Sequence, residues 1–538
     1  MPFCDALPTI SSAAVRTALR AREEIALIDA REEDPFAQAH PLFAAQLPLS
    51  RIELDVPRRL PRREVLIAVY DDGEGLADRA ARRLVELGYR QVHRLVGDLD
   101  GWKHGGGEVF RDVNAPSKAF GELVEHERHT PSLAADEVKA LIDAKADIVV
   151  LDARRFDEYR TMSIPTGISV PGAELALRVR ELAPDPATRV IVNCAGRTRS
   201  IIGAQSLVNA GIPNPVSALR NGTIGWKLAG FELDHGQTRR FGPVDAAGRA
   251  RAQRAAQALA ERAGAKRLPF AALTSLDDGL RTVYRYDVRD PEEFRAGHLA
   301  GFRSAPGGQL VQETDVFAPV RGARIILADD DGVRAPMTAH WLAQMGWEAH
   351  WVDGVSSEHF VRTMPALVDS FRPASVRLMS AARLADMLAD DAAVVVDVSS
   401  SARYLQGHVP GAWWALRSGL ATALARIETA RGKPRCWVVT ADDEAAAEHV
   451  VQDLAELTDA PCYLLSGGNS AWRATGRPQD TDDARLASPR IDRYRRPYEG
   501  TDNPREAMQA YLDWEYGLVE QLRRDGTHGF RVLEAAVR

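Results

Sequence analysis

Cysteine is scarce in this chain, with four among 538 residues, and this scarcity excludes two kinds of protein. The four are Cys4, Cys194, Cys436 and Cys462. They are widely spaced and no two form a Cys-x-x-Cys pair, so we expect neither a disulfide framework nor a zinc site. We expect a reduced, cytoplasmic setting, and nothing in the chain implies a metal or another cofactor.

Long apolar runs and an excess of basic charge are also absent. Without a stretch of about 18 apolar residues, no membrane span is expected, and residues 1–24 lack the basic-then-apolar order of a secretory signal. A net charge of −7 argues against a nucleic-acid binder. We therefore expect partners to include neither membrane nor nucleic acid. The contents of 45% hydrophobic and 27% charged residues are ordinary for a folded protein of several domains.

A single pattern occurs four times along the chain. In each copy an apolar run ends in an aspartate, and the four aspartates are Asp29, Asp152, Asp287 and Asp397. Their spacings of 123, 135 and 110 residues have the size of a domain. Each copy continues with a second apolar run, a polar loop, a helical pattern and a third short strand. This alternation predicts α/β units, each with a small, mainly parallel sheet covered by helices.

The copies divide the chain into segments. We expect units over 1–115, 130–236, 269–370 and 375–484, a connecting helix within 237–268 and a helical tail over 485–538. The stretch that joins the first two units is expected to shape a surface near the site, and the tail is expected to serve packing. Because Asp152 recurs in every copy, we expect it to be structural.

The segment "VIVNCAGRTRSIIGAQSL", residues 190–207, carries the chemistry. Cys194 stands between a predicted strand and a predicted helix, where α/β sheets place their sites. A helix N-terminus, Arg197 and Arg199 all favour a thiolate, so the sequence predicts a lowered pKa for Cys194. Gly196 lets the loop turn its N–H groups inward. Ser200 is expected to cap a helix that starts at Ile201, and Thr198 offers a second hydroxyl.

This segment resembles the active-site loop of rhodanese-type sulfurtransferases. The loop would comprise Cys194, Ala195, Gly196, Arg197, Thr198 and Arg199. A second stretch, "GHVPGAWW" at 407–414, resembles a family signature upstream of the loop. The resemblance implies four tandem rhodanese-like domains. It also implies transfer of sulfane sulfur from an anionic, thiosulfate-like donor to cyanide or a thiol, including a protein thiol, through a persulfide on Cys194.

The resemblance gives each loop residue an expected role. Cys194 would be the nucleophile, and Arg197 and Arg199 would bind the anionic part of the donor. The rest of the donor site would be formed by Ala195, Gly196, Thr198 and Ser200. The other units have "VYDDGEG", "LADDDGV" and "VTADDEA" at the matching place, so we expect them to be catalytically silent.

Two alternatives remain open. A cysteine phosphatase or an arsenate-reductase-like enzyme is less favoured, because Cys-x5-Arg needs arginine at position 200, which holds Ser200. The other alternative is a non-enzymatic persulfide carrier or redox-sensing scaffold, in which Cys194 receives sulfur from a partner and passes it on.

Overall fold

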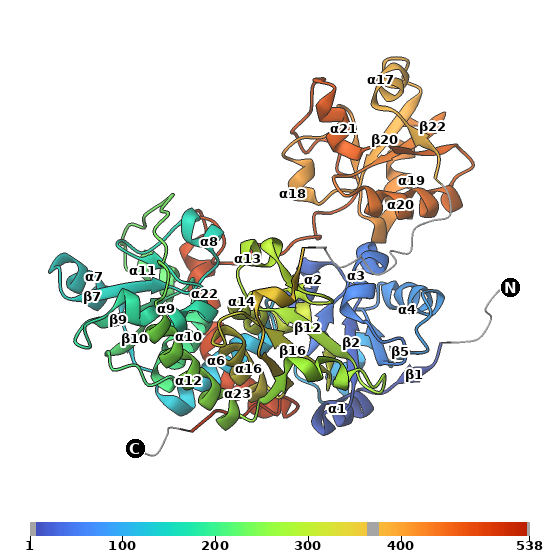
Figure 1. The fold of residues 1–538 in the computed structure, drawn as a ribbon. Helices are drawn as coiled ribbons and strands as arrows, with labels where there is room; N and C mark the ends of the chain where they lie inside the picture. Colours follow the sequence, from blue (N-terminus) through green and yellow to red (C-terminus); the bar gives the residue numbers. More distant parts are fainter. Residues whose placement is uncertain (1–6, 363–375, 535–538) are drawn as a thin grey trace.

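The computed structural model describes residues 7–362 and 376–534, so Cys4, expected at an exposed chain end, lies outside the described residues. Within these ranges the chain forms four α/β units, and Figure 1 shows the fourth unit projecting from the other three. None of the helices described has the length and apolar character that a membrane crossing requires. The described residues also contain no group of three or more His, Cys, Asp or Glu that could hold a metal ion.

The second unit, which carries Cys194, has a five-stranded parallel sheet. Its strands lie in the order β6 (Ser132–Leu133), β10 (Val216–Leu219), β9 (Arg189–Asn193), β7 (Ile148–Asp152) and β8 (Ile168–Ser169). The apolar runs recognised in the sequence form β7 and β9 at the centre of the sheet. Burial of these strands explains why their sequences are nearly continuously apolar.

The other units repeat this strand order. The third has β11 (Lys266–Pro269), β17 (Glu348–Asp353), β16 (Arg324–Ala328), β12 (Val283–Asp287) and β14 (Arg303–Ser304). The fourth has β19 (Leu378–Met379), β23 (Cys462–Leu465), β22 (Cys436–Thr440), β20 (Ala393–Asp397) and β21 (Trp413–Trp414). The first has β1 (Thr9–Ile10), β5 (Gln91–Leu95), β4 (Leu66–Tyr70) and β2 (Ile25–Asp29), with β3 (Ala44–Gln46) beside β2. Four copies of one sequence pattern therefore give four copies of one sheet.

Helices cover both faces of these sheets. Those that follow the central strand are α4 (Leu76–Glu86), α10 (Thr198–Asn209), α16 (Arg334–Gln344) and α20 (Glu444–Leu457). Short helices after the next strand are α5 (Asp98–His104), α11 (Gly222–Leu228) and α21 (Gly468–Ala474). Each of these short helices carries a buried tryptophan, which is Trp226 in the second unit.

Two strands lie where the sequence did not place them. The segment 237–268 contains helix α12 (Ala246–Arg262), but it ends in β11, an edge strand of the third sheet. Strand β15 (Val320–Arg321) leaves the third unit and pairs antiparallel with β2 of the first. A continuous apolar core also joins the first and third units, whereas the fourth unit has cores of its own.

The tail and the linker between the first two units meet at the second unit. The linker forms α6 (Ala115–Arg128), and the tail forms α22 (Arg505–Tyr516) and α23 (Leu518–Asp525). Both tail helices pack on α6, and α22 also contacts α11. Figure 1 shows the tail, in red, returning from the fourth unit to the second unit, where α22 lies near α6 and α10. The last helices of the chain therefore lie beside the Cys194 loop.

Candidate active site

Cys194 directly follows β9, and helix α10 begins four residues later at Thr198. The helix therefore starts before Ile201, so Ser200 lies in its first turn instead of capping it, which corrects the prediction. The Ser200 hydroxyl donates to the Arg197 carbonyl at 2.8 Å, and the Cys194 thiol lies 3.5 Å from the same hydroxyl. Cys194 is only 2% exposed, so the sulfur is enclosed.

Backbone N–H groups of helix α11 hold the loop in place through hydrogen bonds to its carbonyl groups. The N–H of Thr223 donates to the Cys194 carbonyl at 2.9 Å, and that of Ile224 donates to the Ala195 carbonyl at 3.0 Å. Gly222 has a φ of +53°, and a β-carbon there would lie 2.3 Å from the Cys194 carbonyl oxygen. Only glycine fits so close to the loop, and the loop is therefore fixed before any substrate binds.

The predicted lowering of the Cys194 pKa is wrong for this closed site. Burial raises the pKa of the thiol, and the charge of Arg199 and the hydrogen bonds of Ser200 offset that rise only in part. The carboxyl of Glu515 raises it further. The sequence revealed the positive charges but not the depth at which the sulfur lies, and burial disfavours the charged form.

Arg197 is held by carboxylates of the linker helix α6. Its guanidinium donates to Glu122 at 2.6 and 2.8 Å and also contacts Glu125, and the side chain is 3% exposed. The Tyr516 ring lies 4.1 Å from the guanidinium carbon. The linker thus lies at the site, as expected. Arg197 connects the loop to the linker and the tail, and its charge is already balanced before a donor binds.

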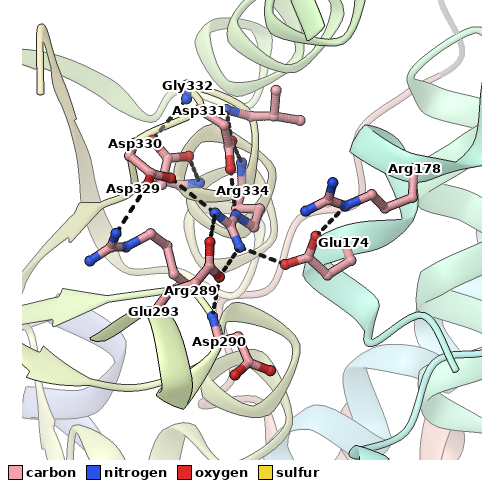
Figure 2. Close-up of polar contacts among 12 residues, drawn as sticks. Glu174, Arg178, Arg289, Asp290, Glu293, Asp329, Asp330, Asp331, Gly332 and Arg334 are labelled. Carbon is pink, nitrogen blue, oxygen red and sulfur yellow. Dashed lines mark hydrogen bonds and ion pairs between the residues drawn. The ribbon is translucent and has the colours of Figure 1, made fainter. Parts of the chain in front are cut away.

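Arg199 is paired as well. Its two terminal nitrogens donate to Glu158, both at 2.8 Å. The third unit repeats this contact, because Arg334 donates to Glu293 at 2.6 and 3.0 Å from the same places in its own loop and helix. Figure 2 shows Arg334 among carboxylates, with Glu174 of the second unit as a further partner at 2.6 Å. The pair is therefore common to the second and third units, and in the second it also places positive charge near Cys194.

In the first unit an aspartate stands where the second has its cysteine. Asp71 directly follows β4, as Cys194 follows β9. Its carboxylate accepts the N–H groups of Gly73 and Ala77, both at 2.9 Å. The loop thus directs backbone donors at the side chain that occupies the cysteine position, which makes that position suitable for a negative charge.

The third unit has the same arrangement around Asp329. Its carboxyl accepts the N–H group of Gly332 at 2.9 Å (Figure 2). It also accepts the N–H group of Ala335 at 2.7 Å. Ala335 lies six residues after Asp329, as Ser200 lies six after Cys194, and the Ser200 N–H is also directed at the Cys194 sulfur. The same backbone donor is therefore available to sulfur in the second unit.

The C-terminal helix α22 contributes residues that the sequence did not identify. A β-carbon at Gly196 would lie 3.1 Å from the Tyr511 ring and 3.4 Å from the Glu515 carboxylate. Thr198 donates a long hydrogen bond to Glu515, at 3.5 Å. A cluster of aromatic residues in the tail, Tyr498, Tyr511, Trp514 and Tyr516, was the one available signal that the tail contacts something.

The remaining residues considered from the sequence lie in the framework. Asp152 and Arg154 form a buried ion pair at 2.7 Å, and equivalent pairs occur in the first and third units. Cys436 and Cys462 are buried in strands of the fourth sheet, where burial raises the pKa of each thiol. Of the three described cysteines, only Cys194 lies in a loop with converging polar groups.

Comparison with known proteins finds family matches in the first, second and fourth units. A family model described as "Rhodanese-like domain" matches residues 12–104, 134–229 and 380–475, together more than half of the chain. A crystal structure of a thiosulfate sulfurtransferase from Pseudomonas aeruginosa is 61% identical. That match covers 98% of this chain and 100% of the other, with a TM-score of 0.96.

Two curated relatives match single regions of the chain. One is an HTH-type transcriptional regulator from Mycobacterium tuberculosis, 30% identical over 90 residues, which are 17% of this chain and 39% of the regulator. The other is an uncharacterized protein from Synechocystis, 32% identical over 99 residues, which are 18% of this chain and 54% of that protein. The chain thus spans about half or less of these two relatives.

Proposed function

The chain belongs to the rhodanese family and is a sulfurtransferase, and we propose that its working site is the Cys194 loop, with a thiosulfate-like anion as donor. One observation carries this proposal. Cys194 occupies the position at which the loops of the first and third units hold a carboxyl group with backbone N–H donors. A persulfide anion on Cys194 would use the same donors, and the thiosulfate sulfurtransferase relative at 61% identity supports the donor class.

The reaction has two steps. The Cys194 thiolate attacks the outer sulfur of thiosulfate, the new S–S bond forms, and the bond to the sulfonate sulfur breaks with its electron pair leaving on sulfite. In the second step cyanide or a thiol attacks the outer sulfur of the persulfide, and Cys194 leaves as a thiolate. In this proposal the positive charges of Arg197 and Arg199 attract the anionic donor. The rest of the donor site is Ala195, Gly196, Thr198 and Ser200.

An arginine-rich cavity lies beside this loop. It has a volume of about 420 Å³ and shares Arg199 with the site, and its wall also includes Arg155, Arg493 and Arg496. Four carboxylates, those of Asp157, Glu158, Glu313 and Glu499, line it too, so the five arginines, which include Arg154, exceed the acidic groups by one. The guanidinium groups favour approach of a small dianion by electrostatic attraction. We propose this cavity as the approach route of the donor.

The test is intact mass after incubation with thiosulfate, on wild type and Cys194→Ser, before and after cyanide. We expect wild type to gain one sulfur atom, cyanide to remove it as thiocyanate, and the folded serine variant to gain none. A gain of sulfur on Cys194→Ser would place the site elsewhere. Catalytic turnover with small molecules alone separates an enzyme from a persulfide carrier, which would load once and require a protein partner.

A further inference from the structure

Helix α22 places a buried carboxyl group against the Cys194 loop. Glu515 is fully buried, and its Oε1 accepts a hydrogen bond from the Tyr511 hydroxyl at 2.7 Å and a longer one from Thr198 at 3.5 Å. Within the described part of the chain, its Oε2 has no hydrogen-bond partner. A β-carbon at Gly196 would lie 3.4 Å from this oxygen, so the unpartnered Oε2 faces the loop.

The cations near Glu515 are paired with other carboxylates. Lys118 of α6 lies 2.9 Å from Asp112, and Arg197 lies 2.6 Å from Glu122. Among residues 7–362 and 376–534, no ion pair to Glu515 is found. A buried carboxylate without a cation is costly, whereas a protonated carboxyl is tolerated. The geometry therefore favours a proton on Glu515 in the resting site, so only the fraction of molecules whose Glu515 has lost this proton can accept another one.

The surroundings of Glu515 agree with this conclusion. Glu515 interacts electrostatically with Lys118 and Glu122 of α6, with Arg197 of the loop and with Tyr511 of its own helix, and its charge acts in turn on Cys194. Burial and the charge of Glu122 raise the pKa of Glu515 to about 8, although Lys118, Tyr511 and Arg197 act in the opposite direction. The carboxyl can therefore gain or lose a proton near neutral pH, as Cys194 changes its own charge.

We propose that Glu515 is the proton-holding partner of Cys194. In its ionised form Glu515 accepts the thiol proton as the persulfide forms, and it returns this proton to Cys194 when the sulfur is transferred. This inference rests on the proposed persulfide function. It gives the C-terminal helix a role in the reaction, and it explains how a thiol that is buried and not ionised at rest can still act as a nucleophile.

The proton balance closes over one cycle. In the first half, the S–H bond of Cys194 breaks and an O–H bond forms on the Glu515 carboxylate, while the thiolate displaces sulfite from thiosulfate. The persulfide anion then faces a neutral carboxyl instead of a second negative charge. In the second half, the acceptor removes the outer sulfur, Cys194 leaves as a thiolate, and Glu515 returns the proton to it.

The first experiment compares the pH dependence of sulfur loading in the full chain and in Glu515→Gln. Loading by thiosulfate is followed by intact mass at short times, from about pH 6 to 9.5. For wild type we expect the rate to rise with pH through an apparent pKa near 8, because the base form of Glu515 is required. For Glu515→Gln we expect this rise to be lost and the rate at high pH to fall by about 100-fold.

Two further variants distinguish proton transfer from packing. Tyr511→Phe removes a hydrogen bond that stabilises the Glu515 carboxylate, so the rise should move about one pH unit upward. Glu506→Gln changes an exposed carboxylate on the same helix and should leave the profile unchanged. Thermal unfolding of each variant establishes that it is folded. An unaltered pH profile in a folded Glu515→Gln would overturn the proposal.

Failure of the proposed function gives a different result. If wild type gains no sulfur at any pH, thiosulfate transfer at Cys194 is wrong, and the proton link is then tested by the rate of Cys194 alkylation with iodoacetamide. In wild type the alkylation rate should rise with pH in two coupled steps, the lower one near pH 8. In Glu515→Gln it should rise in one step. A single step in both proteins would reject the role of Glu515 independently of the donor.

Discussion

Arg199 binds Glu158 through both terminal nitrogens, each at 2.8 Å, within the only described unit that has a cysteine in its loop. The contact between Arg334 and Glu293 repeats it in a unit that has Asp329 in the cysteine position. The pair therefore also occurs in a unit without a loop cysteine, so its presence alone does not mark a sulfur site. What is particular to the second unit is that the same guanidinium acts on a thiol.

Glu158→Gln should separate these two roles of the pair. The amide keeps the shape of the side chain but leaves the Arg199 charge unbalanced, so we expect the free energy of unfolding to fall by about 3 kcal/mol. We also expect the pKa of Cys194 to fall, because the neighbouring positive charge is no longer neutralised. Urea unfolding and the rate of Cys194 alkylation at neutral pH measure the two effects.

Glu293→Gln is the matched control in the third unit. Glu293→Gln should lower the free energy of unfolding by less than Glu158→Gln does, because Arg334 keeps Glu174, Asp330 and Asp331 as partners. It should leave the rate of Cys194 alkylation unchanged. Equal alkylation rates in wild type and Glu158→Gln would mean that the Arg199 charge does not reach the sulfur.

Removal of Arg197 should be more harmful to the fold than to donor binding. Arg197→Gln leaves Glu122 buried without a cation, and we expect a loss of about 3 to 5 kcal/mol in the free energy of unfolding. The double variant Arg197→Gln/Glu122→Gln should recover much of it, because no unpaired charge remains. An increase in the KM for thiosulfate that persists in the double variant would report direct contact of Arg197 with the donor. A KM equal to that of wild type would leave Arg197 only a structural role.

Local pattern was enough to predict the sheets and the loop. The apolar runs that end at Asp152 and Asn193 become adjacent parallel strands, because continuous apolar character suits a strand buried on both faces. The position of Cys194 at the end of β9 follows from that pattern alone. The recurrence of the same pattern in four copies also predicts four similar sheets, and the strand orders agree.

Long-range contacts were beyond the reach of that pattern. Glu122 is 75 residues from Arg197, and Glu515 is 317 residues from Thr198, so no local spacing indicates that they meet. The same holds for β15, which pairs with a strand almost 300 residues earlier in the chain. The pKa of Cys194 was mispredicted for this reason: its charged neighbours are local in sequence, but the segments that bury it are not.

Asp71→Ala should weaken the first unit without affecting sulfur transfer. The change removes the acceptor of two backbone N–H groups, those of Gly73 and Ala77, and we expect the free energy of unfolding to fall by about 2 to 3 kcal/mol. Asp72→Ala, at the exposed neighbouring position, should change it by less than about 0.5 kcal/mol. Both variants should still load one sulfur per chain, and a loss of loading in Asp71→Ala would mean that the first loop takes part in the reaction.

Acid should loosen the contact between the first and fourth units. Glu53 of α3 (Ile52–Arg59) lies 2.9 Å from a terminal nitrogen of Arg417 in the fourth unit and 2.6 Å from Arg83 in its own. Burial raises the pKa of Glu53, but the hydrogen bond and charge of Arg417 outweigh that effect and lower it to about 2. A carboxyl whose folded pKa is depressed contributes stability above its unfolded pKa of about 4.3 and loses it as pH falls toward the folded value.

We therefore expect up to about 3 kcal/mol of stability from Glu53 at neutral pH, lost between about pH 4.5 and 2. Glu53→Gln should remove this part of the acid dependence, measured as the change in thermal midpoint between the two ends of that range. Glu86→Gln is the control, because Glu86 also pairs with Arg83 but is exposed to solvent. If Glu53→Gln and wild type lose stability in parallel as pH falls, the Glu53–Arg417 contact does not control how the fourth unit is held.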